Sequence, residues 1–306
     1  MKTADFPYVT FPFELFNPPQ AEAVQFATKD CNLVVALSTA VGKTAVAMCF
    51  FGHELKSNAA TKCVYASPLR AISEEKLKQF HEVPEWQDVP IMINTGDHMA
   101  RPEDFDAARL IILTTETLDS KARNQDIHGD WLKKVGVLVV DELHLLGDDK
   151  RGAALEAGLV NFTEHNKTAR IVGLSATMSN HDEIALWLKS LNGKSTYVVN
   201  SAWRPGKLTT HILGVVANRS FEAEAQDTLL DLTHEHRGEK VIVFVHTKKI
   251  GRKLTQTFKN GGIKCEFYHA GLSRQERELL EQTFLNTNAG LNVLVTTSAL
   301  AMGVNL

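Results

Sequence analysis

The chain lacks the features that would mark a membrane protein, a secreted protein or a metal-cluster protein. Its four cysteines are never spaced as C-x-x-C, so the clustered thiolates that zinc and iron–sulfur sites require are absent. No apolar run is long enough to span a bilayer, and the first residues contain no signal-peptide core. Single cysteines within apolar runs are typical of buried thiols in a reducing compartment. We therefore expect a cytoplasmic protein with no membrane partner.

An excess of positive charge is also missing. The formal net charge is −3 over 306 residues, which excludes a globally basic nucleic-acid binder. A nucleic-acid motor is still allowed, because such a protein needs only a local basic groove. Hydrophobic residues make up 44% of the chain, which is ordinary for a globular protein, and the length favours two domains.

Short apolar runs alternate with helical patterns through residues 1–199. Runs such as Val135–Val140 are apolar on both faces, which is typical of parallel strands covered by helices on both sides. The alternation predicts a doubly wound α/β domain. Helices are expected from Lys43 to about Leu55 and from about Ile72 to Phe80. Strands are expected at Asn32–Leu37, Lys62–Ser67, Val89–Asn94, Leu110–Thr114, Val135–Val140 and Arg170–Leu174.

A break in the pattern separates a second α/β unit from the first. The segment from Asn200 to Gly206 has turn residues and no period, so residues 200–207 are expected to be a linker. The alternation then restarts over residues 208–306. Only about four strands fit there, which is few for such a domain, so we expect the second domain to be incomplete. These strands are expected at Leu208–Val216, Val241–His246, Lys264–Tyr268 and Leu291–Thr297.

A candidate phosphate loop, with the sequence LSTAVGKT, runs from Leu37 to Thr44 between an expected strand and an expected helix. Such a loop directs backbone N–H groups and a helix N-terminus at one anion. Lys43 would reach the β- and γ-phosphates of a nucleotide, and Thr44 would offer a hydroxyl to Mg²⁺. The strict pattern begins with Gly where Leu37 stands, so a plain loop with a solvated lysine is the alternative. The candidate loop contacts are Ser38, Thr39, Ala40, Val41, Gly42, Lys43 and Thr44.

Two acidic residues follow the apolar run Val135–Val140. Asp141 and Glu142 would lie at the carboxyl edge of a parallel sheet, where open α/β folds bind ligands and where the phosphate loop also lies. Asp141 can hold Mg²⁺, directly or through water, and Glu142 is placed to activate an attacking water. A strand-ending turn is the alternative for this pair taken alone.

Further motifs follow one another in order along nearly the whole chain, from about Phe16 to Leu306. They are NPPQ (17–20), PLRAI (68–72), TGD (95–97), TTET (114–117), DELH (141–144), LSAT (174–177), WRP (203–205), VFVHTK (243–248), YHAGL (268–272) and TTSALAMGVNL (296–306). Together they resemble superfamily 2 DExH-box helicases of the Ski-like group, most closely the archaeal DNA-repair helicases. The resemblance implies two tandem RecA-like domains, ATP and Mg²⁺ as cofactors, and single-stranded DNA or RNA as the partner of an ATP-hydrolysing motor.

The resemblance also implies roles for individual residues. Gln20 would read the adenine edge, and Gly303 and Asn305 would contribute to the nucleotide site. Catalysis would depend on Lys43, Asp141 and Glu142. Hydrolysis would be coupled to movement through His144, Ser175 and Thr177. Sequence-tolerant contacts to the nucleic-acid backbone would come from Arg70, Gly96, Thr114, Thr115, His246, Thr247, His269 and Thr296.

The chain departs from the family pattern in three places. Leu37-Ser38 replaces a small or Met residue followed by Pro, and His246 stands where a small hydroxyl residue is more usual. The chain also ends before the family's arginine-rich motif, so we expect further helicase domains or another chain to supply it. Two alternatives to a DNA helicase motor core stay open. One is an RNA helicase of the same group, and the other is a nucleotide-switched nucleic-acid-binding module that does not hydrolyse ATP.

Overall fold

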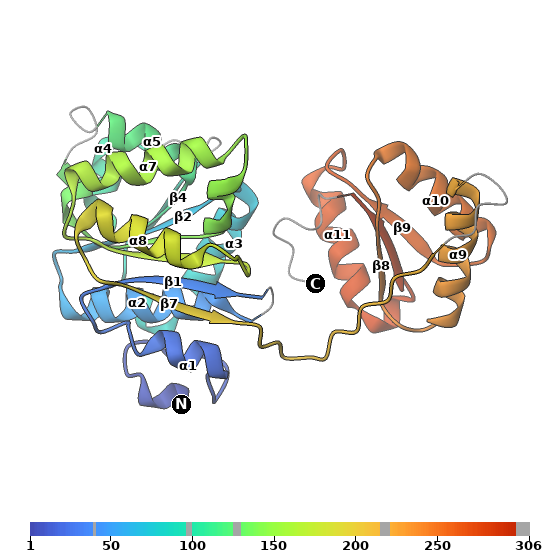
Figure 1. Ribbon diagram of the computed structural model, residues 1–306, viewed down its shortest axis with the longest axis horizontal. Coiled ribbons are helices and arrows are strands. Elements are labelled where there is room, and N and C mark those ends of the chain that lie inside the picture. Colours follow the sequence, from blue (N-terminus) through green and yellow to red (C-terminus); the bar gives the residue numbers. More distant parts are fainter. Residues whose placement is uncertain (39–40, 96–99, 125–129, 215–220, 298–306) are drawn as a thin grey trace. The chain divides into compact units, whose positions relative to one another are not determined.

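The computed structural model describes residues 1–38, 41–95, 100–124, 130–214 and 221–297. Backbone contacts divide the chain into two compact units, Met1–Lys207 and Leu208–Leu306 (Figure 1). Thr39, Ala40, Gly96, Gly303 and Asn305, which the sequence assigned to binding sites, lie outside the described residues. In the part that the structure describes, no helix combines the length and apolar character needed to cross a membrane.

Unit 1 is built on a parallel sheet of seven strands. The strand order is β3-β4-β2-β5-β6-β1-β7, and every pairing between neighbours is parallel. The strands are β1 Asn32–Leu37, β2 Lys62–Ser67, β3 Ile91–Asn94, β4 Leu110–Thr114, β5 Val135–Val140, β6 Arg170–Ser175 and β7 Thr196–Ser201.

Helices cover both faces of this sheet (Figure 1). Alternate strand residues face opposite cores, so Val139 packs in one apolar cluster and Val140 in the other. The first cluster joins the sheet to α1 Pro18–Val24, α2 Lys43–Ser57, α3 Arg70–His81 and the phenylalanines of the N-terminal segment. The second joins it to α4 Pro102–Ala107, α5 Thr115–Arg123, α7 Gly152–His165 and α8 His181–Asn192. Short 3-10 helices lie at Thr3–Asp5, Pro84–Trp86, Asp130–Lys134 and Leu143–Gly147.

Unit 2 has a smaller parallel sheet in the order β8-β10-β9. Its strands are β8 Val241–Phe244, β9 Cys265–Tyr268 and β10 Val293–Thr296. Helices α9 Phe221–Glu235 and α10 Lys248–Asn260 contribute apolar side chains to one core, and α11 Arg274–Leu285 contributes to a second. A 3-10 turn spans Thr287–Ala289. The four cysteines of the chain are buried and unpaired, as expected.

The structure corrects two predictions from the sequence at the junction of the two units. The expected strand Leu208–Val216 is wrong over residues 208–214, which form no strand, and residues 215–216 lie outside the described part. The side chain of Ile212 is 95% exposed, so this apolar run has no neighbouring strand or core to pack against. Asn200 and Ser201, assigned to the linker, instead end β7, where they pair with Ala36 and Leu37 of β1.

Candidate nucleotide site

The candidate site lies at the carboxyl edge of the sheet of unit 1. Because all seven strands are parallel, the loops that follow β1, β2, β5 and β6 emerge at this one edge. The chain passes from β1 to β2 over two strand positions that β5 and β6 later fill. The edge therefore brings the phosphate loop, the DELH turn and the LSAT segment together.

The phosphate loop turns sharply into α2 at Gly42. This residue has φ 76° and ψ 46°, in the left-handed region, and it caps the N-terminus of the 15-residue helix. A Cβ at Gly42 would lie 2.7 Å from Nε2 of Gln20, so a side chain here would be both strained and crowded. Ser38 and Val41 are buried. Lys43 and Thr44 open the helix half-buried, and Nζ of Lys43 donates to the Leu37 carbonyl at 3.4 Å.

Gln20 braces this loop. Its Nε2 donates to the carbonyls of Val41, at 2.9 Å, and Gly42, at 3.0 Å, and its Oε1 accepts from the Asn17 N–H at 3.1 Å. Asn17 is the N-cap of α1 and donates from Nδ2 to the same Val41 carbonyl. Both amide hydrogens of Gln20 are thus used within the protein, which leaves the second lone pair of Oε1 for an outside donor.

Two hydrogen bonds hold Asp141. Its Oδ2 accepts from the hydroxyl of Tyr65 at 2.6 Å, and its Oδ1 accepts from the Glu142 N–H at 3.0 Å. The residue is 8% exposed, at the point where β5 has just ended. Burial, then the charge of Asp141, raises the pKa of the Tyr65 phenol well above its usual value. Sequence reasoning missed Tyr65, whose only local signal is a bulky polar aromatic in the strand KCVYAS.

Glu142 has a strained backbone. In the part of the chain that the structure describes, it is the only non-glycine residue with positive φ, at 54°. Such a conformation costs an L-residue about 1–3 kcal/mol and is common at active sites. Burial raises the pKa of its carboxyl, the charge of Asp141 adds to this effect, and the charges of Lys43 and His144 oppose it. The charge of Lys43 on the phosphate loop therefore favours the ionised form of the Glu142 carboxyl.

His144 connects the DELH turn to the LSAT segment. Its Nδ1 lies 3.3 Å from Oε2 of Glu142, 3.4 Å from Oγ of Ser175 and 3.4 Å from the Ala176 N–H. A ring nitrogen that accepts from Ala176 cannot also donate to Glu142, so the imidazole has two competing arrangements. Ser175 is fully buried, whereas Thr177 is exposed beyond the strand.

The expected nucleic-acid residues of unit 1 differ in their accessibility. Arg70 is exposed at the first position of α3. Thr114 is 6% exposed and uses its hydroxyl as the N-cap of α5, where it accepts from the Thr117 N–H at 3.2 Å. Thr115 is 3% exposed. The hydroxyls of Thr114 and Thr115 are therefore buried within the protein, whereas the Arg70 side chain is exposed to solvent.

A similar division holds in unit 2. His246 and Thr247 are exposed, and Thr247 caps α10 by accepting from the Ile250 N–H at 3.2 Å. Burial, followed by the charges of nearby basic side chains, lowers the pKa of His269, whose Nδ1 accepts from the Gly271 N–H at 3.1 Å. Thr296 is fully buried, and its hydroxyl donates to the next residue's carbonyl.

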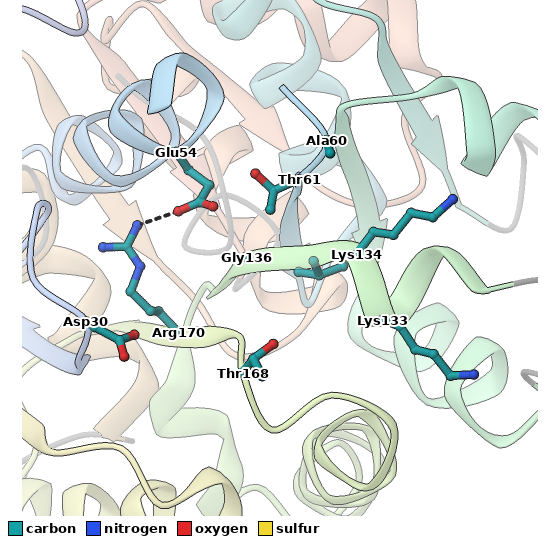
Figure 2. Close-up of a pocket in the computed structure, with 10 residues that line it drawn as sticks. Asp30, Glu54, Ala60, Thr61, Lys133, Lys134, Gly136, Thr168 and Arg170 are labelled. Carbon is teal, nitrogen blue, oxygen red and sulfur yellow. Dashed lines mark hydrogen bonds and ion pairs between the residues drawn. The ribbon is translucent and has the colours of Figure 1, made fainter. Parts of the chain in front are cut away.

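A cavity of about 350 Å³ lies at the opposite, amino edge of the sheet (Figure 2). Basic residues Lys133, Lys134 and Arg170 line it together with Asp30 and Glu54. The helices α2 and α7 end toward this edge, so their dipoles disfavour an anion there. The direction of these helices therefore disfavours a phosphate group in this cavity, although its basic side chains outnumber its acidic ones.

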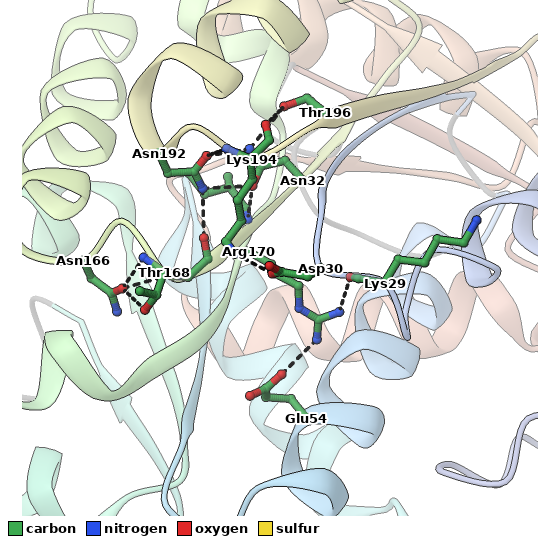
Figure 3. A network of polar contacts seen from close by, with 12 residues as sticks. Lys29, Asp30, Asn32, Glu54, Asn166, Thr168, Arg170, Asn192, Lys194 and Thr196 are labelled. Atoms are coloured by element: carbon green, nitrogen blue, oxygen red, sulfur yellow. Dashed lines mark hydrogen bonds and ion pairs between the residues drawn. The ribbon is translucent and has the colours of Figure 1, made fainter.

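A buried polar network surrounds Arg170 at the amino edge (Figure 3). The guanidinium donates to the carbonyls of Ala27 and Lys29 and, at 2.9 Å, to Oε2 of Glu54. Nearby, Asn32 and Asn192 exchange reciprocal amide bonds of 2.9 and 3.0 Å. These contacts tie the starts of β1 and β6 to the ends of α2 and α8, which makes the network structural.

The motifs on this scaffold belong to a known family. The sequence model of the DEAD/DEAH box helicases matches residues 17–184, and that of the helicase conserved C-terminal domain matches residues 224–306. The chain belongs to the DEAD/DEAH box helicase family. Membership implies the use of ATP.

The chain is also similar in sequence to individual helicases. The ATP-dependent DNA helicase Hel308 of Pyrococcus horikoshii is 33% identical over 329 residues, which cover 94% of this chain and 43% of that protein. The chain therefore spans less than half of this relative's length. The match supports the resemblance to archaeal DNA-repair helicases.

Two solved structures share the fold. The DUF1998 helicase MrfA bound to DNA has a TM-score of 0.76 at 18% identity, over 96% of this chain and 44% of that one. The Mycobacterium smegmatis helicase Lhr bound to ssDNA and AMP-PNP has a TM-score of 0.68 at 23% identity, over 96% and 41%. The predicted α/β class with two tandem RecA-like domains is confirmed.

Proposed function

We propose that this chain is the motor core of an ATP-dependent DNA helicase, with ATP bound at the carboxyl edge of unit 1. The observation that carries the proposal is the DELH turn. There a strained, half-buried Glu142 lies beside Asp141 and within the electrostatic reach of Lys43 on the phosphate loop. A carboxylate with a raised pKa, within the electrostatic influence of a lysine on the phosphate loop, is suited to activate water against a bound nucleotide.

The phosphate loop would hold the nucleotide. The N–H groups at the start of α2 and the ammonium of Lys43 face the same edge as the DELH turn, where they would bind the β- and γ-phosphates. Gln20 offers only an acceptor, the second lone pair of Oε1, and this suits the amino group of adenine. Gln20 would thereby link recognition of the base to the shape of the loop.

Thr44 and Asp141 fit a magnesium ion. Both present oxygen atoms at the same edge, and the described residues contain no group of three or more His, Cys, Asp or Glu that could cage a metal. Mg²⁺ in nucleotide sites is usually bound by one or two carboxylates together with phosphates, so this donor set suits it. When bound, the ion would neutralise charge on the β- and γ-phosphate oxygens. Asp141 would orient it, and Glu142 would take the proton from the attacking water.

Movement and strand binding would use the remaining motif residues. His144 contacts both Glu142 and Ser175. A change in the charge or position of the Glu142 carboxylate would therefore be passed through His144 to the LSAT segment, which includes Thr177. Exposed Arg70, His246 and Thr247 would contact the backbone of single-stranded DNA. The more buried Thr114, Thr115, His269 and Thr296 would shape that surface from beneath. Longer relatives suggest further domains, and a cytoplasmic location is part of this proposal.

Steady-state ATP hydrolysis with and without single-stranded DNA tests the proposal. DNA should stimulate turnover, and Glu142→Gln should lower the turnover number by about 10²-fold or more while nucleotide binding persists. A matched control is Glu164→Gln, the same change at an exposed glutamate in the last turn of α7, which should leave turnover unchanged. If the wild-type chain did not bind ATP, the assignment of Lys43 and Asp141 to the nucleotide site would be overturned.

Parallel arms separate the two alternatives. The choice of DNA is supported by the names of the relatives. It would be overturned if single-stranded RNA stimulated turnover to the same extent as single-stranded DNA. Retained ATP and strand binding without turnover would indicate a nucleotide-switched binding module. Binding should weaken steeply with salt in either case, because contacts to the phosphate backbone dominate.

A further inference from the structure

Tyr65 lies on β2, the strand next to the one that carries the DELH turn. The parallel register pairs Tyr65 with Val139, and the Asp141 N–H continues the ladder by donating to the Ala66 carbonyl at 2.8 Å. Side chains two residues apart on a strand share a face, so Val139, Asp141 and Tyr65 all lie on one face of the sheet. This is also the face covered by α2, the helix of the phosphate loop.

The ring of Tyr65 is clamped from the side. Phe80 of α3 makes an edge contact with centroids 5.6 Å apart, and Phe51 of α2 makes another at 6.4 Å. Phe51 and Phe80 also contact each other at 5.9 Å. Tyr65 has no exposed surface, so its hydroxyl is held at a fixed point 2.6 Å from Oδ2 of Asp141.

These contacts fix the rotation of the Asp141 carboxylate. One oxygen accepts from the phenol and the other from the Glu142 N–H, so the direction of each remaining lone pair is set. A phenylalanine would fill the same apolar clamp equally well. The hydroxyl therefore contributes to the carboxylate and not to the packing.

We infer that Tyr65 is a positioning residue, which aims Asp141 at the magnesium ion of the nucleotide site. This inference rests on the proposed function, since it assumes that Asp141 is the metal-orienting carboxylate. Hydrogen bonds from outer partners hold ligating carboxylates in place, and their loss commonly costs 10- to 100-fold in metal affinity or activity. Tyr65 touches neither nucleotide nor water in this scheme and acts only through Asp141.

The test is a Mg²⁺ titration of ADP binding to wild-type protein and to Tyr65→Phe, with a fluorescent ADP analogue as the probe. The Mg²⁺ concentration for half-maximal binding should rise about tenfold in Tyr65→Phe. Binding of the analogue in EDTA should stay unchanged, because the phosphate loop and Gln20 are intact. A merely structural tyrosine would instead weaken binding equally with and without Mg²⁺, and that result would overturn the inference.

A matched control lies in unit 2. Tyr268 also donates to a carboxylate, Oε1 of Glu281, at 2.6 Å, and is 2% exposed, so Tyr268→Phe removes an equivalent bond elsewhere. Its Mg²⁺ midpoint should match that of wild type. A second variant, Phe80→Leu, loosens the clamp without touching the hydroxyl and should raise the midpoint by a smaller factor.

The two proposals fail differently. A normal Mg²⁺ midpoint in Tyr65→Phe, with wild-type binding dependent on Mg²⁺, overturns only the role of Tyr65. If binding of the ADP analogue to the wild-type protein does not depend on Mg²⁺, the metal role of Asp141 is overturned, and this inference with it. In an Asp141→Asn background, Tyr65→Phe should add no further shift, because the carboxylate that it positions is gone.

Discussion

At the amino edge of the sheet in unit 1, the polar side chains around Arg170 are paired with one another or with backbone groups, whereas Asp141 and Glu142 at the carboxyl edge have their charges only partly balanced. Arg170 meets Glu54 and two carbonyls, and Asn32 meets Asn192 (Figure 3). At the other edge, Asp141 and Glu142 stand side by side, and the second has a left-handed backbone. The same sheet thus ends in a satisfied network on one side and a strained acidic pair on the other.

The two edges of the sheet therefore have different roles, since the amino edge stabilises the domain and the carboxyl edge carries the candidate site. A fully paired network stabilises only if every member keeps its partner, so removing one member should be costly. A site that must bind a phosphate group and a metal needs groups left unpaired, and such sites commonly cost stability. The comparison predicts that substitutions at the two edges have effects of different size and even of opposite sign.

The largest loss of stability is expected from Arg170→Met. The change leaves Glu54, whose side chain is 15% exposed, as an unpaired charge, and it removes a donor from the carbonyls of Ala27 and Lys29. Breaking a buried pair by removing one partner costs about 3–5 kcal/mol of unfolding free energy. Urea unfolding followed by circular dichroism measures it.

The double variant Arg170→Met/Glu54→Leu is the control for that effect. It removes both charges, so much of the lost stability should return. If the single variant unfolds within about 1 kcal/mol of wild type, the amino edge does not stabilise the domain in the way proposed.

A smaller loss is expected from Asn192→Ala. Asn192 is buried near the end of α8, and its Nδ2 donates to Asn32 and to the Ala169 carbonyl. Unpaired buried polar groups cost about 1–3 kcal/mol, so the same urea experiment should show a loss of that order. Asn124→Ala removes a single exposed bond to the Ser120 carbonyl and should change stability far less.

The motifs of the site were predictable because their information is local. The strand Val135–Val140 is apolar on both faces, and the acids follow it directly, so its place at a sheet edge can be read without the fold. The contacts of Tyr65 with Asp141 and of Asn32 with Asn192 join residues 76 and 160 positions apart. They depend on strand order and register, which no local pattern encodes.

Other predictions failed or changed for a similar reason. The apolar run from Leu208 resembles a strand, but strand formation also needs a neighbour, and Ile212 is almost fully exposed. Thr114 carries the expected motif, yet its hydroxyl caps α5, a role that depends on where the helix begins. The motifs therefore locate the candidate residues in the sequence, whereas the accessibility of those residues depends on the packed structure.

The smallest expected effect has the opposite sign to the others. Burial and Asp141 raise the pKa of Glu142 in the folded chain, so the folded state holds this proton more tightly than the unfolded state. The wild-type protein therefore loses stability as the pH rises from below about 4.5 through the folded pKa. Gln does not titrate, so Glu142→Gln should melt at a higher temperature than wild type at pH 7. That difference should shrink as the pH falls through the same window.

Glu54→Gln makes the decisive comparison, because it is the same substitution at the amino edge. It removes the charge that pairs with Arg170, so its melting temperature at pH 7 should fall while that of Glu142→Gln rises. Thermal unfolding of wild type and both variants between pH 4 and 8 measures the two effects together. Shifts in the same direction would contradict the contrast between the two edges, since the chemical change is identical and only the surroundings of the carboxylate differ.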